Sequence, residues 1–430
     1  MNLTPDQLVT AALATHNTVA ILDSCGISYL AAHRLIIGVD PLEVIEISGA
    51  NANESLNLLD EKLNKKTASI FTHSYEFGQK ILGQKPTKTP TPEPDIFLAR
   101  FASLVVHDYV SGKTKVIGDR KQARKLEHLI QSHGEALAGS AARISNLKFE
   151  ISAGSTPITS DFTKSEYIEA VRNIQERIRD GDTYQTNLTQ QFTAELSADT
   201  TPEKIFERLR HDHPVPFSAF IRRGDSAIVS ASPERFFRID RDRSITTSPI
   251  KGTRRRGTSE SEDQRMREEL LASEKDRAEN TMIVDLLRND LGRVCKYGSV
   301  RVDKLCDLET HPTFHHLVST ISGDLRDDAK FSEVLTALFP CGSITGAPKI
   351  STVQIIDEIE PSPRGLSMGA IGYAIDGEIE LSVAIRTMVF RDDAATFNVG
   401  GGITIDSDPE AEYEESLLKA KALLDALGCS

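Results

Sequence analysis

The sequence contains no tryptophan and only five cysteines among its 430 residues. The cysteines are scattered and form no Cys-x-x-Cys pair, which argues against a disulfide framework and against a zinc site. No stretch approaches the roughly 20 apolar residues that a membrane-spanning helix needs. The first ten residues also lack the basic and apolar regions of a signal peptide. We therefore expect a cytoplasmic protein that does not associate with membranes.

Basic residues are outnumbered by acidic residues. The chain has 50 lysines and arginines against 63 aspartates and glutamates, which gives a formal net charge of −13. No basic stripe compensates for this acidic background, so nucleic acid is not an expected partner. A hydrophobic content of 39% with 26% charged residues is typical of a globular protein with ample material for a core.

Apolar periodicity divides the chain into a less readable N-terminal third and a regular remainder. The Pro- and Thr-rich stretch 83–94 predicts an exposed linker or a long loop. From Asp161 onward, strand patterns alternate with strong helical patterns. Helices are predicted over 165–180, stopped at Gly181, and over 278–292, 347–361 and 409–428. Such mixing over about 270 residues predicts one large α/β or α+β unit.

Carboxylates recur at helical spacing on two of these segments. Asp276 and Glu279 are three residues apart and share a helix face, while Glu412, Glu415 and Lys419 lie on neighbouring turns of the last helix. If the two faces met, they would offer a hard cation such as Mg²⁺ the oxygen ligands that it prefers. The alternative is a pair of solvated helix faces.

Two glycine-containing stretches interrupt the regular patterns. Ser343 lies in CGSITGAPK, directly before a predicted helix whose free backbone N–H groups would favour an anion. Gly400, Gly401 and Gly402 stand inside a strand pattern, where glycine suggests a close backbone approach to a ligand. A tight turn or a β-bulge is the alternative for each stretch.

Three basic side chains are candidates for chemistry. Arg386 interrupts an apolar strand and needs a partner, for which a bound anion is one candidate. His316 is a possible acid or base, although a single histidine is more often structural. Lys251, in SPIKGTRRRG, is a solvated loop charge, an anion ligand or a nucleophile. Only a neutral amine is nucleophilic, and nearby cations such as the three arginines 254–256 would lower the pKa of a lysine.

Taken together, these stretches resemble the chorismate-utilising enzymes, the family of anthranilate synthase, aminodeoxychorismate synthase component I, and isochorismate and salicylate synthases. The matching blocks run in the family's order from Gly181 to Leu424 and include GDTYQTNLTQQF, SPERFF, AENTMIVDLLRND, GSITGAPK and GGGITIDSDPEAEYEE. The resemblance implies one large α/β (α+β) chorismate-binding fold, with β-sheets packed as a sandwich and flanking helices. It also implies an N-terminal region, 1–155, interwoven with a catalytic region, 156–430.

The resemblance also implies roles for individual residues. Glu279 and Glu415 match the Mg²⁺ ligands, with Asp276 and Glu412 behind them or ligating through water. Glu234 matches the general acid/base facing the leaving hydroxyl, and His316 matches an active-site histidine. The positions that grip the two carboxylates of chorismate correspond to Ser343, Arg386, Gly400, Gly401, Gly402 and Lys419. Gln185 stands where the water-using members carry a lysine, so water is not the expected nucleophile.

Within the family, a lysine at the position of Lys251 resembles aminodeoxychorismate synthase component I, because the other members generally have alanine there. This implies a transferase that makes 4-amino-4-deoxychorismate for 4-aminobenzoate and folate biosynthesis, with Lys251 as covalent nucleophile. Ammonia would come from a separate glutaminase subunit, because no glutaminase block is visible in the chain. The alternatives are anthranilate synthase component I, a Schiff-base lysine enzyme and a non-catalytic binding scaffold.

Overall fold

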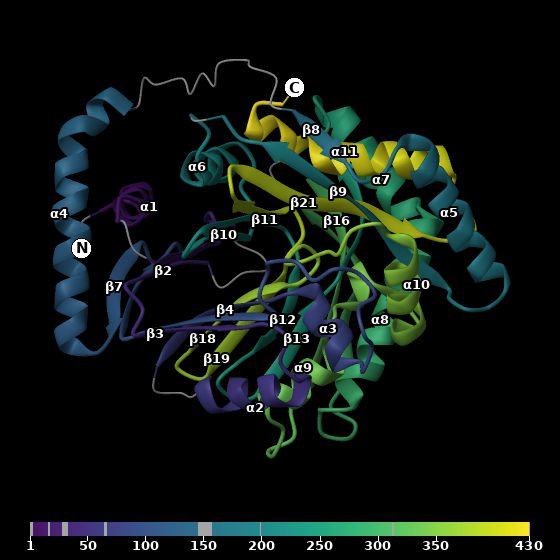
Figure 1. The fold of residues 1–430 in the computed structure, drawn as a ribbon, viewed down its shortest axis with the longest axis horizontal. Helices are drawn as coiled ribbons and strands as arrows, with labels where there is room; N and C mark the ends of the chain where they lie inside the picture. Colours follow the sequence, from purple (N-terminus) through teal and green to yellow (C-terminus); the bar gives the residue numbers. More distant parts are fainter. Residues whose placement is uncertain are drawn as a thin grey trace.

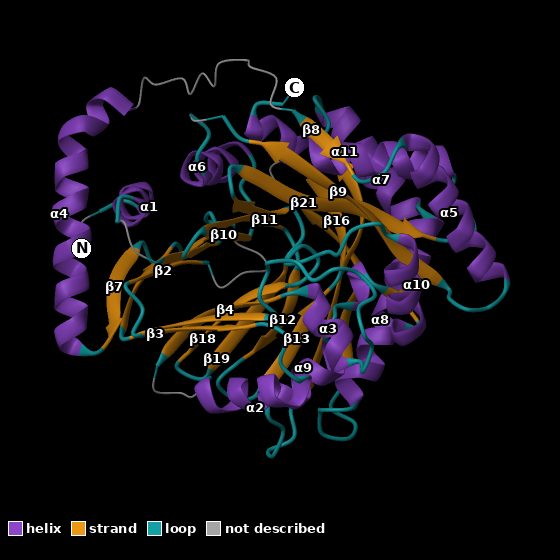
Figure 2. Cartoon of the chain, viewed as in Figure 1, coloured by secondary structure: helices purple, strands orange, loops and turns teal. Residues whose placement is uncertain are grey.

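Two large antiparallel β-sheets flanked by helices form the framework of the protein (Figures 1 and 2). The structure is a computed structural model that describes residues 3–15, 18–27, 33–63, 67–144, 157–197, 199–311 and 314–429. This arrangement confirms the predicted mixed α/β class with packed sheets and flanking helices. Among the described residues, no helix combines the length and the apolar composition that crossing a bilayer requires.

Sheet A has eleven strands and sheet B has ten. In spatial order, sheet A contains β17 (Gly346–Ala347), β9 (Gln185–Glu195), β21 (Ala394–Ile403), β20 (Thr387–Arg391), β11 (Ser226–Ser232), β10 (Phe217–Arg223), β1 (Val19–Asp23), β2 (Arg34–Val39), β6 (Ser103–Asp108) and β7 (Lys113–Gly118), with β8 (Ile158–Ser160) paired to β9. Sheet B contains β14 (Ile250–Arg255), β16 (Phe314–Asp324), β13 (Ser244–Ser248), β12 (Arg235–Ile239), β19 (Glu378–Val383), β18 (Ala370–Ile375), β4 (Ala68–His73), β5 (Ile96–Phe101) and β3 (Glu43–Ile47), with β15 (Arg301–Thr310) paired to β16.

Helices cover the outer faces of the sheets and their edges (Figure 2). The helices are α1 (Pro5–Leu13), α2 (Ala52–Lys62), α3 (Tyr75–Ile81), α4 (Arg120–Ile144), α5 (Lys164–Arg179), α6 (Pro202–Asp212), α7 (Glu260–Ala272), α8 (Glu274–Gly292), α9 (Phe331–Leu338), α10 (Lys349–Ile359) and α11 (Pro409–Leu427), with a 3₁₀ turn, η1, at Gly342–Ile344.

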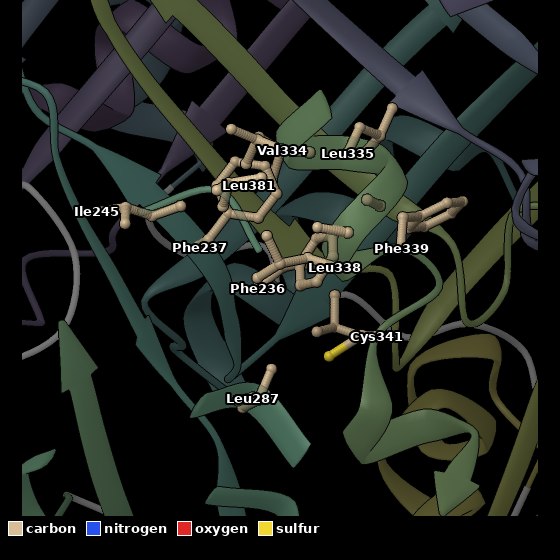
Figure 3. Close-up of a cluster of buried hydrophobic side chains, with 14 of the residues drawn as sticks. Phe236, Phe237, Ile245, Leu287, Val334, Leu335, Leu338, Phe339, Cys341 and Leu381 are labelled. Atoms are coloured by element: carbon tan, nitrogen blue, oxygen red, sulfur yellow. The ribbon is translucent and has the colours of Figure 1, made fainter. Parts of the chain in front are cut away.

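Central strands such as β10 and β11 are buried on both faces, which explains their continuous apolar runs. In β10, Ala219 and Ile221 face a cluster between the two sheets, whereas Phe220 faces the helices that cover sheet A. This alternation follows from the two-residue period of a β-strand. A third cluster lies between sheet B and helices α8 and α9 (Figure 3). It includes Phe339 and Cys341, so it anchors the chain directly before Ser343.

Strands from the first 118 residues belong to both sheets. β1, β2, β6 and β7 lie in sheet A, and β3, β4 and β5 lie in sheet B. β1 pairs with β10, and β4 pairs with β18, so each sheet joins early and late parts of the chain. The predicted boundary between residues 1–155 and 156–430 falls outside the described residues and stays a prediction.

The strongly periodic elements agree with the sequence predictions. The helix expected to stop at Gly181 is α5, and the helices expected over 278–292, 347–361 and 409–428 are α8, α10 and α11. Residues 83–95 form the expected long loop, which is tied to α10 because Asp357 accepts a hydrogen bond from Thr87 N at 3.0 Å. Helix α7 was not predicted, because its only buried residue is Leu270 and it therefore has no apolar stripe.

A buried ion pair joins two segments that matter for the site. Arg364 and Glu360 have side chains that are only 1% and 2% exposed, with N and O atoms 2.7 Å apart. The guanidinium also donates to the carbonyls of Ile344, at 2.8 Å, and Asn187, at 2.7 Å. Glu360 in turn accepts from Thr189 N at 2.7 Å. The pair therefore holds the 342–346 turn against β9.

We predict that Arg364→Met lowers the free energy of unfolding by about 3–5 kcal/mol, because Glu360 would be left buried without a counter-charge. The matched control is Arg177→Met, which removes a partly exposed arginine that also lies 2.7 Å from a glutamate of α10, Glu358. An exposed pair contributes less than about 1 kcal/mol. Urea unfolding measures both, and equal losses would contradict the prediction.

Candidate active site

The predicted site residues meet where one edge of sheet A approaches one edge of sheet B. Strands β9 and β21 come from sheet A and β14 and β16 from sheet B, with α8, α11 and the 342–346 turn around them (Figure 1). Two hydrogen bonds cross this junction. Gln185 Nε2 of β9 donates to Glu279 Oε2 of α8 at 3.3 Å, and Lys251 Nζ of β14 donates to the Ser343 carbonyl at 3.2 Å.

Lys251 is held by a tight packing of β14 on α8. The next residue, Gly252, has a φ of +81°, and a Cβ there would lie 2.9 Å from Asp276 Cβ. A side chain at position 252 would therefore push the strand away from the helix. Glycine at this position allows β14 to bring Lys251 to the Ser343 carbonyl, beside the carboxylates of α8.

Glu234 lies in the connection between β11 and β12 and is 4% exposed. Its Oε1 has no hydrogen-bond partner among the described residues. Burial raises the pKa of the Glu234 carboxyl to about 7, against the opposing effects of a hydrogen bond with Ser343 and the charge of Lys251. Near neutral pH this carboxyl therefore exchanges a proton readily, as a general acid or base requires.

The carboxylate-bearing faces of α8 and α11 lie close together, because Lys275 of α8 contacts Glu412 of α11. Burial raises the pKa of Glu279, while the charges of Lys251 and Lys275 oppose the rise. Glu412 is 4% exposed and accepts hydrogen bonds from Ser407 Oγ at 2.7 Å and from Lys275 Nζ at 3.0 Å. Solvated helix faces, the alternative for these residues, are therefore excluded for Glu412.

Glu415 and Asp276 lie nearer the solvent and each has a basic partner. Lys419 Nζ is 2.8 Å from Glu415 Oε1 and donates to the Gly400 carbonyl at 2.9 Å, which links α11 to β21. The charge of Lys419 lowers the pKa of Glu415, with burial opposing. Asp276 pairs with Arg254 at 3.2 Å.

The three consecutive glycines continue β21 without a bulge. Gly400, Gly401 and Gly402 pair with Thr189, Leu188 and Asn187 of β9 in unbroken register, so the turn or bulge alternative is wrong for them. A Cβ on Gly400 would lie 1.8 Å from the Leu188 carbonyl oxygen, and one on Gly402 would lie 1.9 Å from Gln185 Nε2. A Cβ on Gly401 would lie 3.2 Å from Glu412 Oε2. Glycine is needed because site side chains and β9 pack directly on this strand.

His316 and Arg386 lie on the sheet B side of the site. His316 is buried in β16, and its Nδ1 is 2.9 Å from Thr253 Oγ1. Burial lowers the pKa of His316 to about 3, and the charge of Arg386 adds to this effect. The imidazole is therefore neutral at physiological pH. The Arg386 guanidinium lies 5.8 Å from the centroid of the Phe314 ring, and no carboxylate among the described residues forms an ion pair with it.

The carboxylates of Glu279, Glu412 and Glu415 provide the type of donor atom that a magnesium ion binds. Glu412 Oε2 and Glu415 Oε1 lie 3.2 and 3.8 Å from the point where a Cβ on Gly401 would be, and Glu279 Oε2 lies 3.5 Å from the equivalent point on Gly402. Carboxylate oxygens are preferred Mg²⁺ ligands. In the described part of the chain, however, no three His, Cys, Asp or Glu side chains are spaced as ligands of one ion. The ammonium groups of Lys275 and Lys419 lie at these carboxylates instead.

The three arginines after Lys251 are paired with carboxylates. Arg254 contacts Asp276, Arg255 contacts Glu262, and Arg256 contacts Asp263 at 2.8 Å. The last two contacts attach α7 to β14. The pairs compensate the arginine charges, so the hypothesis of an unpaired positive field beside Lys251 is not supported.

Two lysines with notable contacts were not identified from the sequence, and one of them, Lys275, lies at the site. Lys275 precedes Glu279 by four residues, a spacing that places both on one helix face and could have revealed it. Lys349, in the GAPK block, is buried and donates to Asp290 Oδ2 at 2.8 Å and to the Leu338 carbonyl at 2.8 Å. Its contacts join α8, α9 and α10, and no sequence spacing links residues 290 and 349.

Comparison with known proteins identifies the family of the chain. A family model described as "chorismate binding enzyme" matches residues 27–425. Over 355 residues the chain is 37% identical to anthranilate synthase component 1 of Aquifex aeolicus, covering 80% of this chain and 71% of that protein. Over 269 residues it is 45% identical to aminodeoxychorismate synthase component 1 of Salmonella typhimurium, covering 62% of this chain and 59% of that protein.

A solved structure extends the similarity to almost the whole fold. The crystal structure of anthranilate synthase component I from Streptococcus pneumoniae matches with a TM-score of 0.76 and 29% identity, covering 92% of this chain and 93% of that chain. The chain is a chorismate-utilising enzyme, and it belongs to the family of chorismate-binding enzymes.

We predict that Glu234→Gln changes how stability depends on pH. The ordinary pKa of a glutamate is 4.5, and that of folded Glu234 is about 7. Between these values the unfolded chain releases a proton that the folded chain keeps, so the free energy of unfolding falls as pH rises through this window. The substitution should remove that part of the decline. Urea unfolding from pH 5 to 8 measures it, with Glu169→Gln as the exposed control; identical slopes would contradict the assignment.

We predict that Gly402→Ala lowers chorismate turnover by about a hundredfold, because the added Cβ displaces the Gln185 amide and misplaces reacting groups by about 1 Å. Gly292→Ala is the control, because a Cβ there meets no atom within 4 Å. Steady-state kinetics on samples with unchanged circular dichroism measure the effect. Normal turnover by Gly402→Ala would show that Gln185 does not matter for the reaction.

Proposed function

We propose that the chain is the chorismate-binding subunit of an aminodeoxychorismate synthase. It would replace the C4 hydroxyl of chorismate with ammonia and so make 4-amino-4-deoxychorismate, the precursor of 4-aminobenzoate for folate. The supporting observation is the position of Lys251. Its amine donates to the Ser343 carbonyl, and the charge of Lys251 acts on the buried Glu234 carboxyl, which also interacts with Ser343. A nucleophile and an acid thus border the same turn.

The proposed reaction has two displacement steps. In the first, the neutral Lys251 amine bonds to C2, both ring double bonds shift by one position, and the C4–O bond breaks while Glu234 gives its proton to the hydroxyl, which leaves as water. The Lys251 nitrogen then gives a proton to the Glu234 carboxylate. In the second, ammonia bonds to C4, both double bonds shift back, and the C2–N bond breaks as Glu234 protonates the departing Lys251 nitrogen. The new nitrogen at C4 then returns a proton to Glu234. A pKa of about 7 suits the Glu234 carboxyl to this exchange, because an acid or base is most effective when its pKa lies near the working pH.

The remaining site residues would bind and orient the substrate. Arg386 is a guanidinium without a carboxylate partner among the described residues, and such a group pairs well with a substrate carboxylate. Neutral His316 would donate or accept a hydrogen bond, not a proton. Lys419, Ser343 and the Gly400–Gly402 backbone would bind the second carboxylate. A magnesium ion held by Glu279 and Glu415, with Glu412 and Asp276 behind them, would neutralise the ring carboxylate.

Neutral ammonia, the second nucleophile, is scarce in solution because ammonium predominates at neutral pH. We propose that a separate glutamine amidotransferase subunit delivers it. The chain spans only 59% of the length of its relative in Salmonella and 71% of its relative in Aquifex. The activity of a complete synthase is therefore part of the proposal.

Anthranilate synthase component I is the second candidate, because relatives with that name match in sequence and in structure. Such an enzyme would add ammonia elsewhere on the ring and release pyruvate. Lys251 favours the first candidate, because a covalent lysine at C2 directs ammonia to C4.

We predict that the chain, given chorismate, Mg²⁺ and ammonium salt, makes 4-amino-4-deoxychorismate and no anthranilate. Added aminodeoxychorismate lyase should convert the product to 4-aminobenzoate, which fluorescence and mass spectrometry detect. Lys251→Ala should abolish the reaction, whereas Lys296→Ala, which removes an exposed lysine paired with Asp327, should not.

Two outcomes would overturn the proposal. Anthranilate and pyruvate as the direct products would favour the second candidate. Full activity of Lys251→Ala would exclude the covalent lysine, whichever product forms.

A further inference from the structure

Lys275 reaches from α8 across the site to α11. Its Nζ lies 3.0 Å from Glu412 Oε1, and the two side chains differ in exposure: 47% for Lys275 and 4% for Glu412. A buried carboxylate needs a compensating charge, and Lys275 supplies it from a half-exposed position. Ser407 Oγ donates to the same oxygen of Glu412 at 2.7 Å and keeps that carboxylate in place from the α11 side.

The Lys275 ammonium also acts on the other two carboxylates of the site. Burial opposes its charged form, but the charges of Glu412, Glu279 and Glu415 together raise the pKa of Lys275 above its ordinary value. The Lys275 ammonium therefore contributes positive charge to all three carboxylates, together with Lys251 at Glu279 and Lys419 at Glu415. This explains why the donors suit a divalent cation in kind but are not spaced around one point in the described structure.

Lys419 differs from Lys275 in its attachments. It is bound to Glu415 at 2.8 Å and to the Gly400 carbonyl at 2.9 Å, so it is fixed to both α11 and β21. Lys275 has one side-chain partner, Glu412, among the described residues. Its flexible four-carbon stem can turn into solvent without breaking a second hydrogen bond or ion pair within the described part of the chain.

We propose that Lys275 is an internal counter-ion that competes with the divalent cation: its ammonium holds Glu412 when no metal is bound and leaves the carboxylates when a metal binds. The inference rests on the metal site of the proposed function. An ammonium and a divalent cation repel each other at the same carboxylates, so the free energy of metal binding includes the displacement of Lys275. Lys275 is thus a positioning residue that sets the metal affinity of the free enzyme.

The test is a titration of the full chain with Mn²⁺ without chorismate, in which electron paramagnetic resonance counts the free ion. Lys275→Met should tighten Mn²⁺ binding by about tenfold, because a nearby positive charge is removed from a partly buried site. Lys275→Arg keeps the charge and should not tighten binding. Lys421→Met is the matched control, because it removes an exposed lysine whose one ion-pair partner in the described ranges is Asp425 on the same helix.

Thermal unfolding supplies a second readout. Without metal, Lys275→Met should unfold at a lower temperature than wild type, because Glu412 loses its counter-charge. Saturating Mn²⁺ should raise the unfolding temperature of this variant more than that of wild type. Lys275→Gln keeps a hydrogen-bond donor for Glu412 without the charge, and it replaces Lys275→Met in both assays if the methionine variant does not fold.

The outcomes separate this inference from the proposed function. Unchanged or weaker Mn²⁺ binding by the uncharged variants, with normal binding by wild type, would overturn the role of Lys275 and leave the metal site intact. Tighter binding by Lys275→Arg would show that size and not charge is responsible, which also overturns the inference. Absence of Mn²⁺ binding in wild type and in every variant would overturn the metal site itself.

Discussion

The site depends on one electrostatic constraint: several carboxylates are withdrawn from water, and each needs a proton or a positive charge. The protein meets this need in three ways. Glu234 has no cation in direct contact, and burial raises its pKa to about 7, so it holds a proton. Glu412 has Lys275, and Glu415 has Lys419. The proposed reaction uses the exchangeable proton of Glu234. The proposed metal site uses carboxylates whose lysine counter-ions can be exchanged for a metal ion.

The two-sheet framework brings these carboxylates and their partners together in one site. The early strands β1, β2, β6 and β7 form one end of sheet A, and β4, β5 and β3 form one end of sheet B. The strands β9, β21, β14 and β16 lie towards the opposite ends of the two sheets. There the Arg364–Glu360 pair holds the 342–346 turn against β9, and the hydrophobic cluster with Phe339 holds the same turn from the other side. Ser343 is thus fixed between Lys251 and Glu234 by contacts that include no site residue, so the reacting groups need not provide their own scaffold.

The absence of a side chain at Gly252 and at Gly402 makes room for different neighbours. Gly252 lets β14 pack on Asp276 of α8, whereas Gly402 gives space to the Gln185 amide. In both cases the missing side chain lies next to a residue that was predicted from the family resemblance. The sequence suggested a close backbone approach at 400–402, and the structure shows that β9 and the Gln185 amide approach this backbone. The approach of a ligand to the same backbone stays a prediction.

The sequence alone determined the elements whose pattern is local. The helices that carry Asp276 and Glu279, or Glu412 and Lys419, follow from apolar periodicity, and the order of the blocks indicated the family and most site residues. Only the tertiary structure decided which residues meet. The contacts of Lys275 with Glu412 and of Arg364 with Asn187 join positions more than 130 residues apart. Helix α7 was also missed, since it is attached by ion pairs and not by an apolar stripe. Local periodicity indicates which face of a helix or strand is buried. The charged residue that compensates a buried group can be distant in sequence, so only the tertiary structure identifies it.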